Sequence, residues 1–246
     1  MPLEIHEVAN DKIPKTKPVK EVMDTYVPDI VEGVSRRNGG ITLYIGSGGS
    51  GKTSHLLGQM KTVYKKKFHH IWYFCPSASF LSVENHPFEK HDKVYHELTT
   101  EALDDIREEL TRIKEDWLRE EGDMPEYSLV IIDDFANNLK DKHLLAKLNS
   151  MLIKARHLSC CFLFTVQSYL YYPKILRKQL TWVSIFSGVR NKEEWNTITK
   201  ELLKMSEQDA KTLYDYVFDK PYQHMDLDLF EEKFYKNGNH LEITEN

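Results

Sequence analysis

Residues 46–53 carry the clearest chemistry in the sequence, because GSGGSGKT matches the phosphate-binding pattern GxxxxGK(S/T). The glycines let successive backbone N–H groups turn toward phosphate oxygens, and the helix that follows directs its positive end at the same anion. In this pattern Lys52 contacts the β- and γ-phosphates of ATP, and the hydroxyl of Thr53 ligates Mg²⁺. We therefore predict ATP and Mg²⁺ as cofactors, bound through Gly46, Ser47, Gly48, Gly49, Ser50, Gly51, Lys52, Thr53 and Ser54.

Three polar residues at the ends of apolar runs complete the predicted site. Asp133 and Asp134 directly follow the run at 128–132, and Gln167 follows the run at 161–166 in the same way. We predict that Asp133 holds the magnesium water shell and that Asp134 is the base that polarises the attacking water. The amide of Gln167 is predicted to sense the γ-phosphate or the water.

Hydrolysis also needs a cation that neutralises the charge developing in the transition state. Three arginines in the half of the chain after Asp133 can be considered: Arg156, Arg177 and Arg190. Arg156, which lies shortly before the run that leads to Gln167, is the first choice for this arginine finger, and Arg190 is the second.

An α/β fold is expected to position these residues. Five short segments are apolar throughout rather than alternating, which is typical of strands buried on both faces of a parallel sheet. They lie at 41–45, 71–75, 128–132, 161–166 and 182–186. Helical patterns occupy most of the intervals, at 99–122, 141–157 and 193–203 among others. The predicted organisation is an arm with a short helix at 1–38, a P-loop ATPase domain at 39–219, and a strand or hairpin with a tail at 220–246 that completes the same domain.

Composition excludes several classes of protein. The 246 residues contain 33 Lys and Arg against 38 Asp and Glu, and the net charge of −5 argues against a protein that grips nucleic acid through bulk positive charge. Residues 99–122 alone hold nine acidic and four basic residues, so one predicted helix accounts for the whole net charge of −5. We expect this helix on the outer surface of the protein, away from any bound DNA. Basic residues gather locally at 61–70 and 171–178.

The apolar runs are too short to span a membrane. The start of the chain lacks the apolar block of a signal peptide, which predicts a cytosolic protein. In that compartment the three cysteines are expected to be reduced.

The segments GSGGSGKT, LVIIDD and RHLSCCFLFTVQS, in this order, resemble the FtsK–HerA superfamily of P-loop ATPases. Within it, they are most similar to viral genome-packaging ATPases of the poxvirus and virophage type. The resemblance spans about 41–188 and implies an ASCE-type, mostly parallel sheet between helices. The implied strand order is 5-1-4-3-2, with the acid-bearing strand not adjacent to the phosphate-loop strand.

The same resemblance implies a partner and a task. A homo-oligomeric ring, a hexamer or pentamer, would bind ATP at its subunit interfaces, and a neighbouring subunit would contribute the arginine finger. The ring would move double-stranded DNA, without sequence specificity, into a preformed capsid, with a capsid or portal component as a further partner. The implied location is the viral factory in the host cytoplasm, or the virion. Asp134 departs from the pattern, because many such ATPases use the longer glutamate there.

Two other classes of protein share the phosphate-binding loop. A nucleotide or small-molecule kinase normally has an arginine-rich lid over the phosphates, but the sequence shows no cluster of arginines. A kinase function also gives no role to Gln167. A weakly catalytic nucleotide switch that acts as an adaptor would explain the aspartate at 134 as a sign of attenuated hydrolysis. Stimulation of ATP turnover by DNA separates the motor from both.

Overall fold

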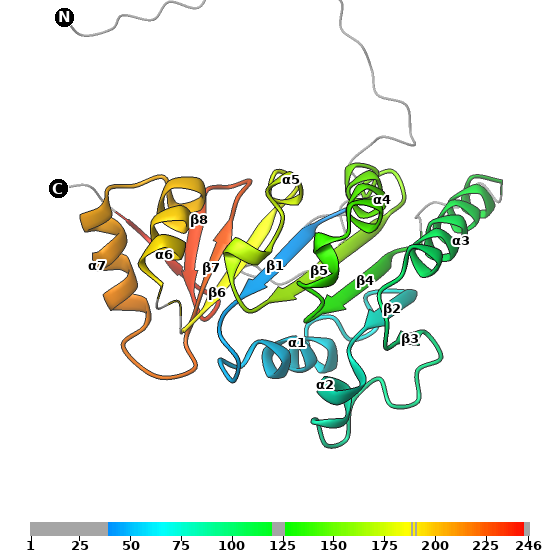
Figure 1. The fold of residues 1–246 in the computed structure, drawn as a ribbon, viewed down its shortest axis with the longest axis horizontal. Coiled ribbons are helices and arrows are strands. Elements are labelled where there is room, and N and C mark those ends of the chain that lie inside the picture. The colour runs from blue at the N-terminus through cyan, green and yellow to red at the C-terminus, as the bar shows by residue number, and fades with distance from the viewer. Residues whose placement is uncertain (1–38, 120–125, 188, 190, 244–246) are drawn as a thin grey trace, which may run out of the picture.

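A computed structural model describes residues 39–119, 126–187, 189 and 191–243 of the chain. Figure 1 shows a twisted sheet with helices on both of its faces. The arm predicted for residues 1–38 and the second finger candidate, Arg190, lie outside the described residues. In the described part of the chain, no helix is both long enough and apolar enough to cross a bilayer.

The strand order confirms the predicted fold. In spatial order the sheet runs β3 (Val94–Tyr95), β2 (His70–Phe74), β4 (Ser128–Asp133), β5 (Cys160–Val166), β1 (Ile41–Ile45), β6 (Trp182–Phe186), β7 (His224–Asp228), β8 (Lys233–Lys236), β9 (Asn239–Leu241). The five predicted strands are β1, β2, β4, β5 and β6, and they stand in the order 5-1-4-3-2 when read from β6. They pair in parallel, and β5 separates the acid-bearing β4 from β1. Strand β3 extends one edge in parallel, while β7, β8 and β9 extend the other edge antiparallel.

Helices lie close to the positions predicted at 99–122, 141–157 and 193–203. The helices are α1 (Lys52–Lys61), α2 (Ser77–Leu81), α3 (Thr100–Arg119), α4 (Lys142–Ile153), α5 (Lys174–Arg177), α6 (Lys192–Ile198) and α7 (Glu207–Val217), with the 3₁₀ helices η2 (Asn138–Lys140) and η3 (Tyr169–Tyr171) and the π-helix η4 (Thr199–Leu203). Figure 1 places α1 and α2 on one face of the sheet and α3, α4 and α5 on the other. A parallel sheet covered in this way is buried on both faces, which explains why its strands are apolar throughout.

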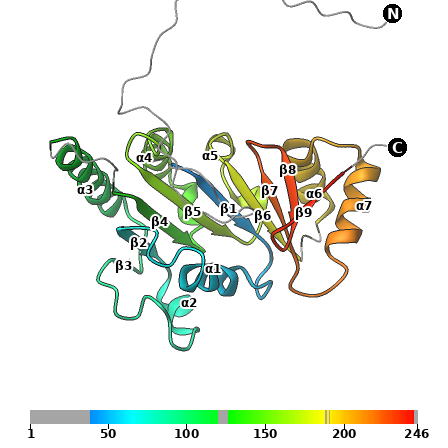
Figure 2. The ribbon, with the colours of Figure 1, turned by 180° about the vertical axis from the view of Figure 1, so that it is seen from behind.

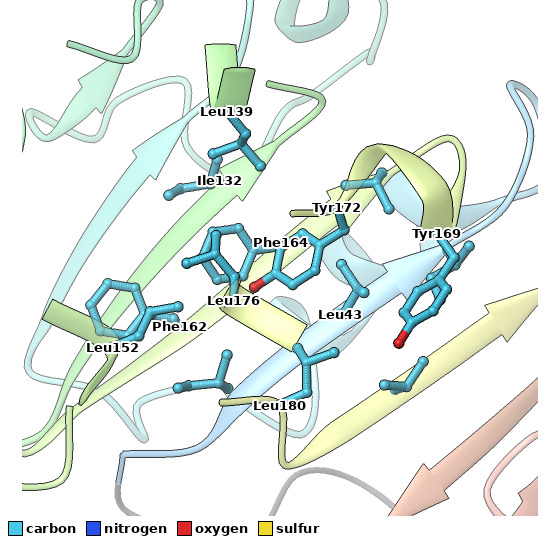
Figure 3. Close-up of a cluster of buried hydrophobic side chains, with 14 of the residues drawn as sticks. Leu43, Ile132, Leu139, Leu152, Phe162, Phe164, Tyr169, Tyr172, Leu176 and Leu180 are labelled. Atoms are coloured by element: carbon cyan, nitrogen blue, oxygen red, sulfur yellow. The ribbon is translucent and has the colours of Figure 1, made fainter. Parts of the chain in front are cut away.

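Two apolar clusters hold these layers together. On one face, Leu56 and Leu57 of α1 pack against Tyr44 and Ile131 of the sheet. On the other face, the side chains of α3, α4 and α5 pack against residues such as Leu43 and Phe164, as Figure 3 shows for α5 and its surroundings. Each buried leucine or phenylalanine contributes about 1.5–3 kcal/mol relative to an exposed one. The carboxyl edge of the sheet is therefore a rigid platform.

The acidic helix α3 presents its charges outward. Leu103, Ile106 and Leu110 are buried on its inner face, while most of its acids are partly or fully exposed. In the view from behind, α3 lies at one end of the molecule, beside α4 and β4 (Figure 2). The position of α3 relative to DNA stays a prediction. The three cysteines, Cys75, Cys160 and Cys161, are buried and form no disulfide bond.

Candidate nucleotide-binding site

The phosphate-binding loop connects β1 to α1 at the carboxyl edge of the sheet. Its first residue, Gly46, donates its backbone N–H to the carbonyl of Val166 at 3.2 Å. A Cβ on Gly46 would lie 2.7 Å from Ser50 Oγ and 2.8 Å from Phe186 Cβ, so no larger residue fits there. Gly51, with φ of 98°, turns the chain into α1 in a conformation that favours glycine. The glycines at positions 46 and 51 therefore follow from the shape of the loop.

Lys52 is buried at the start of α1, with 8% of its surface exposed. Its Nζ donates to the carbonyl of Gly46 at 2.5 Å and to that of Ser47 at 3.0 Å. Burial lowers the pKa of Lys52 from its usual value, and the carboxylates of Asp134 and Asp133 oppose that shift. The ammonium group thus donates to neutral carbonyl oxygens of the loop. In the presence of a nucleotide, the charged phosphate oxygens would be stronger hydrogen-bond acceptors for it.

Asp133 is fixed by hydroxyl groups from three elements. Tyr73 donates its hydroxyl to Asp133 Oδ2 at 3.0 Å, Thr165 donates to Oδ1, and Thr53 Oγ1 lies 3.5 Å from Oδ2. The carboxylate is 1% exposed, and burial raises its pKa while the hydrogen bonds from Thr165 and Tyr73 lower it. The two residues predicted to serve the metal, Thr53 and Asp133, are therefore neighbours. Neither Tyr73 nor Thr165 was predicted, because each is one more residue of an apolar strand.

Asp134 and Gln167 form a second pair at the same edge. Asp134 has a left-handed backbone, with φ of 61°, which is uncommon outside glycine and is tolerated best by asparagine and aspartate. Its N–H donates to Thr165 Oγ1 at 3.1 Å, and Gln167 Nε2 donates to its Oδ1 at 3.1 Å. Both side chains are exposed, so the predicted base and the predicted sensor lie together and open to a ligand.

Arg156 lies at the opposite edge of the sheet. It precedes the amino end of β5, whereas Gln167 follows the carboxyl end. Because β5 has seven residues, the strand separates the two positions by about 23 Å at 3.3 Å per residue. A Cβ on Gly39 would lie 2.5 Å from the backbone N of Arg156, so Arg156 lies beside the residues that lead into β1. The structure does not bring Arg156 to the phosphate loop of its own subunit.

Arg177 is held in the interior of its own subunit. It contacts both carboxylate oxygens of Glu201, at 3.0 and 3.2 Å, and its guanidinium lies over the ring of Tyr169. It also donates to the carbonyls of Tyr169 and Tyr172, both at 2.9 Å. This arginine anchors the segment that follows Gln167.

The donor set fits ATP and Mg²⁺. Ser50 Oγ, within the phosphate loop, is buried and has no hydrogen-bond partner among the described residues. Buried polar groups normally have a partner, and a phosphate oxygen of a bound nucleotide would supply one. Thr53 and Asp133 offer the oxygen ligands that Mg²⁺ prefers. No group of three or more His, Cys, Asp or Glu in the described ranges can hold a metal ion. The pair formed by Thr53 and Asp133 suits Mg²⁺, which keeps several waters and binds through one or two protein ligands and the phosphates.

A cleft of about 760 Å³ opens beside the loop. One wall consists of residues 49–55, and the other contains Phe186 and residues 221–224 and Asn237. The second wall belongs largely to the C-terminal hairpin, which the motifs did not identify as part of the site. No motif in the sequence could have revealed it, because the hairpin reaches the loop only through the pairing of β7 with β6.

Valine in place of Thr165 is expected to weaken the site and the fold together. Valine keeps the shape but removes the donor to Asp133 and the acceptor of the Asp134 N–H, and an unsatisfied buried group costs about 1–3 kcal/mol. We expect lower free energy of unfolding in denaturant titrations and a higher Mg²⁺ requirement for ATP turnover. Thr42→Val, in buried β1, is the control. An unaltered Mg²⁺ requirement would show that Thr165 does not orient Asp133.

Comparison with known proteins places the chain in a family. The model of the family described as poxvirus A32 protein matches residues 40–220. The structure is similar to B204, the DNA-packaging ATPase from Sulfolobus Turreted Icosahedral Virus, at 17% identity over 84% of this chain and 98% of that one, with a TM-score of 0.56. It is also similar to the genome packaging NTPase B204 from Sulfolobus turreted icosahedral virus 2 in complex with AMPPCP, at 15% identity over 85% of this chain and 100% of that one, with a TM-score of 0.52.

A cellular protein shares the fold as well. The cytoplasmic domain of the type VII secretion ATPase EccC from Thermomonospora curvata matches at 16% identity over 80% of this chain and 25% of that one, with a TM-score of 0.52. A comparison with curated protein sequences gives no match. At these identities the solved structures show the fold alone, whereas the family model covers well over half of the chain. The family resemblance inferred from the sequence is confirmed: the chain belongs to the poxvirus A32 protein family, and its fold is that of P-loop ATPases.

Proposed function

We propose that this protein is an ATP-driven motor that translocates double-stranded DNA and packages a viral genome into a capsid. The observation that carries the proposal is that the phosphate loop, Asp133, Asp134 and Gln167 lie together at one edge of the sheet, in a chain of the A32 family. Lys52 would bind the phosphates, and Thr53 and Asp133 would hold Mg²⁺. Asp134 and Gln167 would contact the attacking water. Mg²⁺, when bound, would neutralise phosphate charge.

By this proposal ATP is hydrolysed between subunits, with Arg156 as the arginine finger. Within one subunit this residue lies a strand length away from the phosphate loop, so it can act as the finger only on a neighbour's nucleotide. In a homo-oligomeric ring, hexameric or pentameric, head-to-tail packing would bring this edge of one subunit against the site of the next. ATP hydrolysis in one subunit would then depend on the position of the neighbouring subunit's arginine.

A segment suited to DNA directly follows Gln167. Tyr169 and Tyr172 anchor it in the core, as Figure 3 shows, and leave Tyr171, Lys174 and Lys178 exposed. Contacts of Gln167 with the γ-phosphate change upon hydrolysis, and the anchored segment would transmit that change to the exposed lysines. Lysines bind DNA phosphates without reading bases, so binding would be salt-sensitive and indifferent to sequence.

The named functions of the relatives also support a packaging role. B204 is described as a DNA-packaging ATPase, and its length corresponds closely to that of the present fold. By this proposal the further partners are double-stranded DNA, other copies of the chain, and a capsid or portal component. The protein would act in the viral factory of the host cytoplasm or with the virion.

The proposed function is tested by ATP turnover with and without duplex DNA of arbitrary sequence. We expect DNA to raise turnover and increasing salt to remove the stimulation, because phosphate contacts release counterions. Alanine at both Lys174 and Lys178 should reduce the stimulation and leave basal turnover unchanged. Lys211→Ala, an exposed lysine on α7, is the matched control.

The other classes of protein give different results in the same assay. Turnover that ignores DNA and requires a small phosphate acceptor would identify a kinase and contradict the motor. Tight ATP binding with no turnover, with or without DNA, would identify a nucleotide switch and contradict it equally.

A further inference from the structure

The cleft beside the phosphate loop has a wall that lies beyond the family match. Residues 221–224 and Asn237 line this wall, whereas the family model ends at residue 220. The wall is firmly built: Ser187 donates its N–H to the carbonyl of Gln223 at 3.2 Å, and Asn237 Nδ2 donates to Gln223 Oε1 at 2.6 Å. His224 donates its N–H to Asn237 Oδ1 at 2.9 Å. The start of β7 and the turn after β8 therefore form one unit.

The sheet order indicates which end of a nucleotide meets this wall. Asp134 and Gln167, which face the γ-phosphate by the proposed function, lie at the ends of β4 and β5, on one side of β1. The cleft wall lies on the other side of β1, at the ends of β6 and β7. A triphosphate that lies along the loop with its γ end toward Asp134 must direct its ribose and base toward the hairpin.

Tyr222 is the residue of this wall best suited to a base. It is 73% exposed, and a Cβ on Gly51 would lie 3.7 Å from its Cδ1, so the ring stands over the phosphate loop. Its backbone is left-handed, with φ of 62°, which is strained for a bulky side chain. Strained residues gather at ligand sites, where the surrounding structure imposes them. An exposed aromatic ring beside a cleft also offers a face on which a base can stack.

We propose that the C-terminal hairpin is the base-binding wall of the nucleotide site and that Tyr222 stacks on the nucleobase. This inference rests on the proposed ATP binding and adds the residue that holds the base. Stacking recognises the face of the ring rather than its edge. The site therefore binds ATP and GTP with similar affinity, and the phosphate loop supplies the remaining affinity.

The test compares two variants with two ligands. Tyr222→Asn removes the ring and suits the left-handed backbone, so the variant retains the fold, which thermal denaturation checks. Tyr222→Phe keeps the ring. We expect Tyr222→Asn to bind ATP at least about fivefold more weakly, since base–aromatic stacking supplies that much per base. Its affinity for inorganic tripolyphosphate, which has no base, should equal that of the unaltered protein, and Tyr222→Phe should bind both ligands normally.

Calorimetric titration with each ligand gives a clear decision. Unaltered ATP affinity in Tyr222→Asn overturns the inference and leaves the proposed function intact. An equal loss of ATP and tripolyphosphate affinity also overturns it, because the substitution would then act on the phosphate loop. Failure of the unaltered protein to bind ATP at all would instead overturn the proposed function, and the inference with it.

Discussion

Alanine in place of Lys52 is expected to abolish ATP turnover. The ammonium group lies at the centre of the phosphate loop and is the cation that the loop itself provides to the β- and γ-phosphates. Loss of one preorganised donor to developing charge typically costs about 10²–10³ in kcat, and a charged donor should cost at least as much. Steady-state phosphate release measures the effect.

The matched control for this prediction is Lys61→Ala. Lys61 ends the same helix, is exposed, and lies at its far end from the loop. We expect this variant to hydrolyse ATP at the unaltered rate, and both variants to keep the fold, since alanine is the best helix former. Turnover by Lys52→Ala comparable to that of Lys61→Ala would show that the loop does not bind the hydrolysed phosphate.

Alanine in place of Arg156 is expected to leave ATP binding intact and to stop hydrolysis. An arginine finger supplied by a neighbour contributes about 10³–10⁵ in kcat. The residue is exposed at the edge opposite the phosphate loop, so its removal does not alter the binding site of its own subunit. Binding of a fluorescent ATP analogue and phosphate release measure the two effects separately. Arg112→Ala, an exposed arginine on α3, is the control.

Mixing of inactive variants tests the same interface more sharply. An Arg156→Ala subunit retains its phosphate loop, and a Lys52→Ala neighbour retains Arg156, so a mixed interface contains every group that hydrolysis needs. We expect the mixture to recover part of the activity that both pure preparations lack. Normal hydrolysis by Arg156→Ala alone would place the finger elsewhere, and Arg190 would then be the next candidate.

The sequence predicted that residues from separate local motifs would lie together at one edge of the sheet, and they do. The phosphate loop, Asp133 and Gln167 each follow an apolar strand, and carboxyl ends of parallel strands meet at one edge of a sheet. The pattern of fully apolar segments likewise gave the α/β class. The order of the five core strands came from the resemblance to a family, and the structure agrees with it.

The parts that the sequence did not predict depend on tertiary pairing. Tyr73 reaches Asp133 only because β2 pairs with β4, and an apolar strand gives no sign of which tyrosine faces a carboxylate. Strand β3 has two residues, too few for a periodic pattern. Tyr222 lies far along the chain from Gly51, and the antiparallel pairing of β7 with β6 brings it to the loop.

The central claim is that ATP hydrolysis moves this protein along double-stranded DNA. Displacement of a third strand bound at one end of a long duplex measures such movement directly. We predict ATP-dependent displacement by the unaltered protein, none by Lys52→Ala, and none with a non-hydrolysable ATP analogue. Hydrolysis of ATP at full rate on this duplex, with the third strand left in place, would contradict the account.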